Sequence, residues 1–296
     1  MDRLIDEIVT VKVTDAAATA DSTSVNTVAV VGLTGKEDAS VSVEFSLDGT
    51  ENSVAADFGD DSEVYKVATS FFKEDNNPGK LVCIPVSEED EITAANIKTI
   101  LEAAVSLGKD KNNRVVDFYH VILRLDSSAN AEKAIALSEA LQDWCNDNFK
   151  VAHIEIQDRT VADSVAAHFS EVPPKRVYFY FHKEENERSL AAAIVANRCY
   201  SDPARGTWAH KTLTSVKADV TTKANIKDAE EKVLNIYCTV AGVPRLFFGS
   251  AAGGKYFIDE QIKKDWLKFR TQEAVFNILG SANNGDGVDY NGGGIS

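Results

Sequence analysis

The sequence has no long apolar run, and its amino terminus has no basic region followed by an apolar one. None of its windows approaches the roughly eighteen consecutive apolar residues that a membrane-crossing helix needs. We therefore expect no membrane insertion and no export by the usual secretory route.

Positive charge is also scarce. The 296 residues include 31 Lys and Arg against 46 Asp and Glu, which gives a formal net charge of −15. Such a surface repels the phosphates of nucleic acids and of anionic membranes. Nucleic acid is therefore not an expected partner.

Cysteine is limited to Cys83, Cys145, Cys199 and Cys238, which lie far apart in the sequence. They form no CxxC pair, and no histidine stands at metal-ligand spacing from them. We predict buried free thiols in a reducing compartment and expect no metal and no cofactor.

The 44% hydrophobic content is sufficient for a buried core.

Strand and helix patterns alternate through the middle of the chain. Periodicity and turn residues predict strands over 28–31, 41–45, 80–86, 115–123, 149–156, 176–181, 236–240 and 245–248. They predict helices that begin at Ser62 and Thr93, and further helices over 128–146, 161–169, 187–198, 225–234 and 259–279. This alternation predicts an α/β fold with a mainly parallel, doubly wound sheet that is covered on both faces.

Two regions depart from this rhythm. The apolar alternation of Val41, Val43 and Phe45 before an Asp48-Gly49 turn predicts an antiparallel pair with residues 28–31. Past Tyr200 the periodicity weakens, which predicts a smaller α+β part at the carboxyl-terminal end.

The first residues contain a short alternating pattern. Val9, Val11 and Val13 alternate with Thr10 and Lys12, as in a strand with one apolar face, and a small-residue spacer follows. One interpretation is a frayed terminus. The other is an arm that adds a strand to a neighbour's sheet.

Catalytic motifs are missing or incomplete. Gly32-Leu33-Thr34-Gly35-Lys36 follows a strand but lacks the spacing of a phosphate-binding loop. The five histidines come without a GxSxG motif, and three of them (His120, His153, His182) fall within or at the ends of predicted strands, where structural histidines are common. We expect that the protein is not an enzyme.

Four segments together resemble the contractile tail sheath proteins of phages and of phage-derived injection machines. They are Val67-Ala68-Thr69-Ser70-Phe71-Phe72 with Asn77-Pro78-Gly79, then Arg205-Gly206-Thr207-Trp208, then Asn235-Ile236-Tyr237, and finally Gly254-Lys255-Tyr256-Phe257-Ile258-Asp259 with Asp265-Trp266-Leu267 and Arg270-Thr271-Gln272. The order and spacing of these segments over about residues 25–280 carry the resemblance. The end of the sequence departs from the resemblance. Val288-Asp289-Tyr290 resembles a segment that precedes a last helix and an arm strand in the family, but the sequence contains no pattern for either after it.

The resemblance implies a subunit that polymerises around a tail tube and contracts. It implies an arm and linker at 1–24, a polymerisation domain from 25–37 with 200–280, a subtilisin-like α/β domain without a working triad at 38–199, and a flexible tail at 281–296. Its implied partners are further copies of itself, the tail tube protein, and baseplate and tail terminator proteins. Its implied location is a virion tail that is assembled in the cytoplasm of a bacterial host.

Six residues follow as interaction candidates. Val9, Val11 and Val13 are candidates for strand addition. Trp266, Phe269 and Arg270 are candidates for the tube side or a subunit interface, with ordinary core packing as the alternative for the two aromatic residues. Two rival functions stay open: an α/β enzyme that binds a nucleotide or sugar at the carboxyl ends of the strands, and a non-contractile structural protein of the virion.

Overall fold

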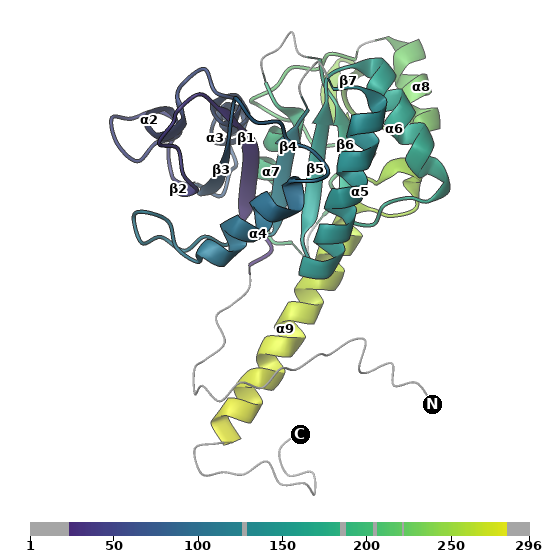
Figure 1. The fold of residues 1–296 in the computed structure, drawn as a ribbon. Coiled ribbons are helices and arrows are strands. Elements are labelled where there is room, and N and C mark those ends of the chain that lie inside the picture. The colour runs from purple at the N-terminus through teal and green to yellow at the C-terminus, as the bar shows by residue number, and fades with distance from the viewer. Residues whose placement is uncertain (1–23, 126–128, 184–187, 204–205, 221, 283–296) are drawn as a thin grey trace, which may run out of the picture.

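One mixed sheet organises the described chain. The computed structural model describes residues 24–125, 129–183, 188–203, 206–220 and 222–282, and its eight strands are ordered β2-β3-β1-β4-β5-β6-β7-β8 (Figure 1). They are β1 (Val28–Thr34), β2 (Ser42–Glu44), β3 (Leu81–Ser87), β4 (His120–Arg124), β5 (Val151–Ile156), β6 (Val177–Phe181), β7 (Asn235–Val240) and β8 (Val243–Phe247). All neighbours from β3 to β7 are parallel, and the edge strands β2 and β8 are antiparallel to theirs. The predicted α/β class with a mainly parallel sheet is confirmed.

Helices cover both faces of this sheet. The longer helices are α3 (Glu63–Phe72), α4 (Ile97–Leu107), α5 (Ala131–Asn148), α6 (Arg159–Glu171), α7 (Leu190–Cys199), α8 (Lys223–Lys232) and α9 (Ile258–Ala282). Buried side chains of α4, α5, α6 and α8 share one apolar cluster with the sheet, and those of α3, α7 and the start of α9 share the other. This double cover explains why the central strands are nearly continuous apolar runs, since both faces exclude water.

Local sequence fixes the ends of several helices. Ser62 caps α3 by accepting the amide N–H of Tyr65 at 3.1 Å, as predicted. Ser189 caps α7 in the same way through Ala192, so that this helix begins at Leu190 and not at the predicted residue 187. Gly108 ends α4 with a positive φ, a conformation that glycine adopts without steric cost. The Ser62 cap shows that a helix start can be predicted where a single capping side chain determines it.

Three other predicted details are wrong. Strand β2 pairs with β3 and not with β1, because β3 and β4 already occupy both edges of β1. Helix α4 begins at Ile97, since the side chain of Asn96 binds the N–H and hydroxyl of Thr93 in a turn instead. Strand β4 begins at His120, because Val115 forms a small antiparallel bridge with Lys109.

The predicted domain division remains a prediction. Strands β1, β7 and β8, which were assigned to the polymerisation domain, lie in the same sheet as β3–β6. The arm, its linker up to residue 23, and residues 283–296 lie outside the described part of the chain.

Helix α9 leaves the body. Its 25 residues correspond to a length of about 37 Å, and Figure 1 shows it running from the sheet past the lower end of α5. None of the described helices combines the length and apolarity needed to cross a membrane.

Candidate functional site

The carboxyl ends of the parallel strands are the usual place for chemistry in this fold class. The connections that leave β1 and β4 go to opposite faces of the sheet, and a crevice lined by Gly32, Leu33, Glu63, Arg124 and Lys133, among others, lies between them. Its volume is about 40 Å³, far below the roughly 300–1,000 Å³ of typical small-molecule pockets.

The charged groups of the crevice are paired with one another. Arg124 binds Glu63 through Nε at 3.1 Å and Nη2 at 2.6 Å, and Lys133 binds Glu91. Burial raises the pKa of Glu63, but Arg124 and Lys66 outweigh it, so that the net pKa is lowered. The charged side chains of the crevice are therefore engaged in ion pairs.

Glu155, deeper along β5, has a structural role. Its Oε2 accepts hydrogen bonds from the hydroxyl of Ser189 at 2.8 Å and the N–H of Ala191 at 2.9 Å, both at the start of α7. Burial raises its pKa, against the opposing effects of His182 and Arg124. This carboxyl group joins the sheet to the helix that covers it.

Two histidines form a buried chain across the sheet. His120 Nδ1 lies 2.9 Å from His153 Nε2, and His153 Nδ1 lies 3.0 Å from the hydroxyl of Tyr180. The other nitrogen of His120 lies 3.0 Å from the carbonyl oxygen of Val25, and the ring of Trp208 stacks on His153 at 5.2 Å. Burial lowers the pKa of His120 to about 3 and that of His153 well below its usual range. Both imidazoles are buried structural groups, as the sequence predicted, and their lowered pKa values keep them neutral.

His182 is the third histidine at a strand end. Its Nδ1 lies 3.1 Å from Asp219, whose carboxylate outweighs burial and raises the pKa of His182. Within the described residues, no histidine hydrogen-bonds a serine hydroxyl, and no group of three His, Cys, Asp or Glu side chains is arranged to hold a metal. The four cysteines are buried and unpaired, as predicted.

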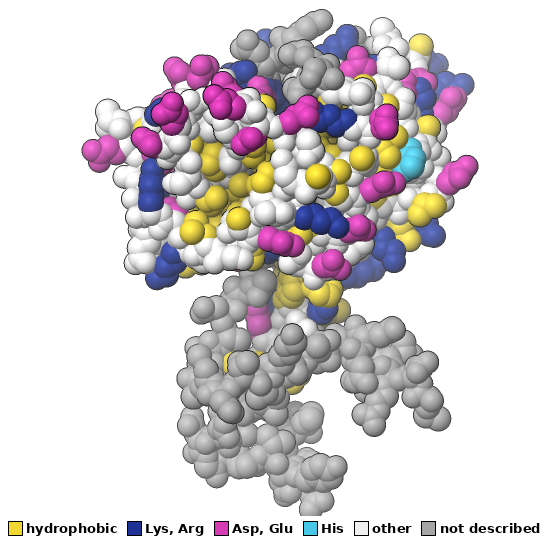
Figure 2. All heavy atoms as spheres, in the orientation of Figure 1, with side chains coloured by type: hydrophobic (Ala, Val, Ile, Leu, Met, Phe, Trp, Pro, Cys, Tyr) yellow, Lys and Arg dark blue, Asp and Glu magenta, His cyan; other side chains and the backbone are white. Residues whose placement is uncertain are grey.

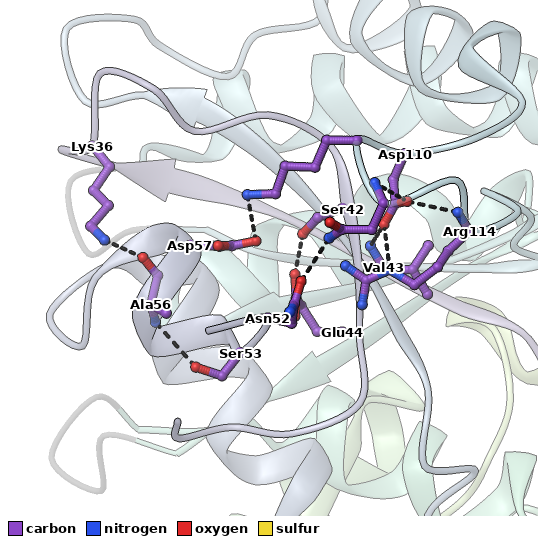
Figure 3. Close-up of polar contacts among 12 residues, drawn as sticks. Lys36, Ser42, Val43, Glu44, Asn52, Ser53, Ala56, Asp57, Asp110 and Arg114 are labelled. Carbon is purple, nitrogen blue, oxygen red and sulfur yellow. Dashed lines mark hydrogen bonds and ion pairs between the residues drawn. The ribbon is translucent and has the colours of Figure 1, made fainter. Parts of the chain in front are cut away.

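The sheet edge at β2 holds a different polar cluster, which the sequence did not predict. The carboxylate of Asp110 accepts the outward N–H of Val43 at 3.0 Å, together with the N–H groups of Asn112 and Arg114 (Figure 3). The guanidinium of Arg114 adds an ion pair at 2.9 Å. A side chain thus takes the place that a further strand would occupy, and it protects an edge that otherwise pairs with other chains.

Neighbouring contacts fix the loop that carries Asp110. Lys111 lies 2.8 Å from Asp57, and Asn112 donates to the side chain of Asn52 at 2.8 Å. Figure 3 labels the two partners, Asp57 and Asn52. Glu44 is buried beside this loop, and burial, followed by the nearby Asp57, raises its pKa. The turn residues around Asp110 are visible in the sequence, but nothing there shows that its carboxylate is buried.

The opposite edge, at β8, is covered by the chain itself. The N–H of His210 donates to the carbonyl of Leu246, and the N–H of Leu246 donates to the carbonyl of Lys211, both at 2.8 Å. The hydroxyl of Thr212 adds a bond to the carbonyl of Pro244 at 3.1 Å. Both edges of the described sheet are therefore already hydrogen-bonded.

The sequence-predicted interaction residues have different fates. Trp266 and Phe269 are half-buried and pack against the body, where the ring of Phe269 meets Tyr119 edge-on at 6.4 Å. Arg270 forms an ion pair with Glu273 at 2.7 Å along α9. Within the subunit, both aromatic side chains pack against the body, as the core-packing alternative expects. Their role at an interface stays a prediction. Val9, Val11 and Val13 lie outside the described residues.

Comparison of the sequence with protein-family models and with curated proteins finds no match.

Proposed function

We propose that this protein is the structural subunit of a contractile tail sheath, which polymerises around a tail tube and changes shape without catalysis. The proposal begins from the resemblance carried by the segments around Phe71, Trp208 and Trp266. It includes the finer assignments that go with that resemblance: a subtilisin-like sheet, a polymerisation domain over 25–37 and 200–280, self-assembly, and partners in the tube, baseplate and terminator.

The single observation that carries the proposal is the anchoring of α9. The first half of this helix is fixed to the sheet through Asp265 and Ile262, and it then continues away from the body (Figure 1). Leu267, on this helix, is 61% exposed. A helix that is held at one end and extends from the body suits contact with another subunit better than it suits catalysis.

The paired groups at the strand ends support the same choice. An enzyme of this fold needs an open crevice and a titratable group that is free to react. Here the crevice is about 40 Å³, and Arg124, Glu63 and Glu155 are engaged in structural bonds. Nucleotides are therefore expected to give no saturable thermal stabilisation of the purified protein.

The test is electron microscopy of the full chain. We expect ordered tubes or stacked rings, and two tube lengths in native particles. A double Val9→Asp, Val11→Asp variant should lose assembly, because charge on the apolar face prevents strand addition. The matched control is Thr10→Ala with Lys12→Ala, on the other face of the same predicted strand, which should assemble normally. Assembly of both variants would contradict the arm role, and a protein that forms no polymer under any condition would contradict the function.

A further inference from the structure

A pocket lies at the amino ends of β1 and β3, the opposite end of the sheet from the crevice. It has a volume of about 230 Å³, and its walls include Ser24, Thr27, Val28, Lys80 and Val82. This volume exceeds that of a single aliphatic side chain. Unlike the crevice, it is large enough to receive parts of a peptide.

Exposed apolar side chains lie beside this pocket. Lys80, in the pocket wall, donates to the carbonyl of Val115 at 3.3 Å, and Val115 itself is 56% exposed. Val115 pairs with Lys109 in a small antiparallel bridge, and Leu107, two residues before Lys109, is 50% exposed. The guanidinium of Arg114 lies over the ring of Phe45, which is 55% exposed. Figure 2 shows hydrophobic side chains at the surface around α4, in this part of the molecule. We call Phe45, Leu107, Val115 and the pocket the amino-end surface.

The charge of the amino-end surface differs from that of the chain as a whole. Lys80 lines the pocket and Lys109 pairs with Val115 in a small bridge, whereas Lys111 is paired with Asp57 and the carboxylate of Asp110 is buried in its bonds to β2. Asp117 also lines the pocket, and the ammonium of Lys150 lies 3.9 Å from it. In a protein of net charge −15, this surface therefore favours an acidic segment with apolar side chains.

The chain contains one such segment next to this surface. Leu4-Ile5-Asp6-Glu7-Ile8-Val9 combines four aliphatic residues with two carboxylates. It is joined to the body through Ser24, which is itself part of the pocket wall. The fourteen intervening positions, 10–23, allow residues 4–9 to reach any part of the surface, since an extended chain spans about 3.3 Å per residue.

We propose that in the free subunit residues 4–9 fold back on the amino-end surface of their own chain. Aliphatic side chains of the segment enter the pocket and cover Val115 and Leu107, while Asp6 and Glu7 face Lys80 and Lys109. Attachment through a short linker gives the segment an effective concentration of the order of millimolar. At micromolar protein this favours the subunit's own segment over that of a second copy by about a hundredfold to a thousandfold. The contact occupies the segment until assembly.

Disulfide trapping tests this contact, because all four native cysteines are buried. In the full chain, the double variant Ile5→Cys, Val115→Cys is oxidised mildly at micromolar concentration. We expect an intramolecular disulfide, seen as a monomer of altered mobility on a non-reducing gel. The control pairs Ile5→Cys with Val172→Cys, at a site that is 78% exposed on α6's carboxyl-terminal end, and should form at least tenfold less of the crosslink.

Each other outcome overturns the proposal. A crosslink between chains, seen when the two single variants are mixed, would assign the surface to a second copy. Equal trapping at Val115 and Val172 would show no docking. The contact does not depend on the sheath function, since trapping is measured on the free subunit and polymer formation is scored separately by microscopy.

Charge reversal gives a second readout without oxidation. Trapping in the Ile5→Cys, Val115→Cys background should fall severalfold with Lys80→Glu and Lys109→Glu, and should recover when Asp6→Lys and Glu7→Lys are added. Loss of trapping without recovery would contradict the assigned charge pairing.

Discussion

The guanidinium of Arg176, just before β6, binds both oxygens of the Asp265 carboxylate in α9, at 2.5 and 2.8 Å. The hydroxyl of Tyr119 donates to the same carboxylate at 2.6 Å, and the ring of Phe149 lies 5.4 Å from the guanidinium carbon. Both charged side chains are almost completely buried. Burial alone lowers the pKa of Arg176, but Asp265 outweighs it and raises that pKa. The pair thus joins a long helix to the sheet, beside the apolar packing of Ile262 and Phe269.

Replacement of Asp265 by Ala should loosen α9. It leaves the buried Arg176 without its counter-ion, and we expect a loss of about 3–5 kcal/mol in the free energy of unfolding, measured by urea denaturation. The control is Lys263→Ala in the same helix, which removes only the half-exposed pair with Asp259 and should cost less than about 1 kcal/mol. Equal costs would contradict the anchoring role.

The buried histidine pair predicts a dependence of stability on pH. Below pH 6.5 the unfolded chain takes up protons that His120 and His153 do not accept in the fold, so the free energy of unfolding decreases as the pH falls. Each imidazole contributes up to about 1.4 kcal/mol per pH unit below its unfolded pKa. In a His153→Gln variant, the free energy of unfolding should fall less steeply between pH 6.5 and 4.5, with a slope smaller by up to about 1.4 kcal/mol per pH unit. Parallel curves for the variant and the wild type would refute this assignment.

Removal of the Asp110 carboxylate should open the β2 edge. In an Asp110→Ala variant the N–H of Val43 loses its acceptor, and we expect its hydrogen exchange to accelerate at least about tenfold. Lys111→Ala, one residue away, removes an ion pair with Asp57 and leaves that N–H bonded, so its exchange should stay close to wild type. Unchanged exchange at Val43 in the first variant would show that another group closes the edge.

Alanine substitutions at two glycines should distinguish the cost of backbone strain from the cost of a steric clash. Gly249 and Gly242 have φ values of +77° and +79°. A Cβ at Gly249 would lie 2.7 Å from the N of Ala209, whereas a Cβ at Gly242 meets nothing within 4 Å. Gly242→Ala should therefore cost about 1–2 kcal/mol, and Gly249→Ala about 1–3 kcal/mol more, as measured by thermal and urea unfolding. Similar costs would mean that the loop beside Trp208 moves away without penalty.

The sequence predicted the parts of the fold that local patterns determine. The predicted start at Ser62 placed the beginning of α3 within a residue, and the alternation of elements predicted the parallel sheet. Where a prediction failed, a non-local contact decided the outcome. β2 joined β3 because β1 was already flanked, and the five-residue helix α2 (Val54–Phe58) is too short to show a period.

The polar contacts of Arg176 and Asp110 could not be predicted from the sequence, because they also depend on non-local contacts. Arg176 and Asp265 are 89 positions apart, and Asp110 and Val43 are 67 apart, so no spacing rule links them. The wide spacing of the cysteines predicted free buried thiols, and the position of the histidines in predicted strands predicted structural roles, because each of those inferences needs only the burial of a segment. A charged side chain reaches a sheet edge only through the folded arrangement of the strands, which no local pattern shows.

The closed edges have a consequence for any strand that a neighbour contributes. Such a strand at β8 must first displace the carbonyl and amide of 210–211, and at β2 it must displace Asp110. The incoming backbone then replaces bonds that already exist, so the exchange changes the number of hydrogen bonds little, while the departing groups impose an activation barrier. Growth of an assembly through these edges would thus be limited by how fast a subunit opens and much less by how tightly it binds.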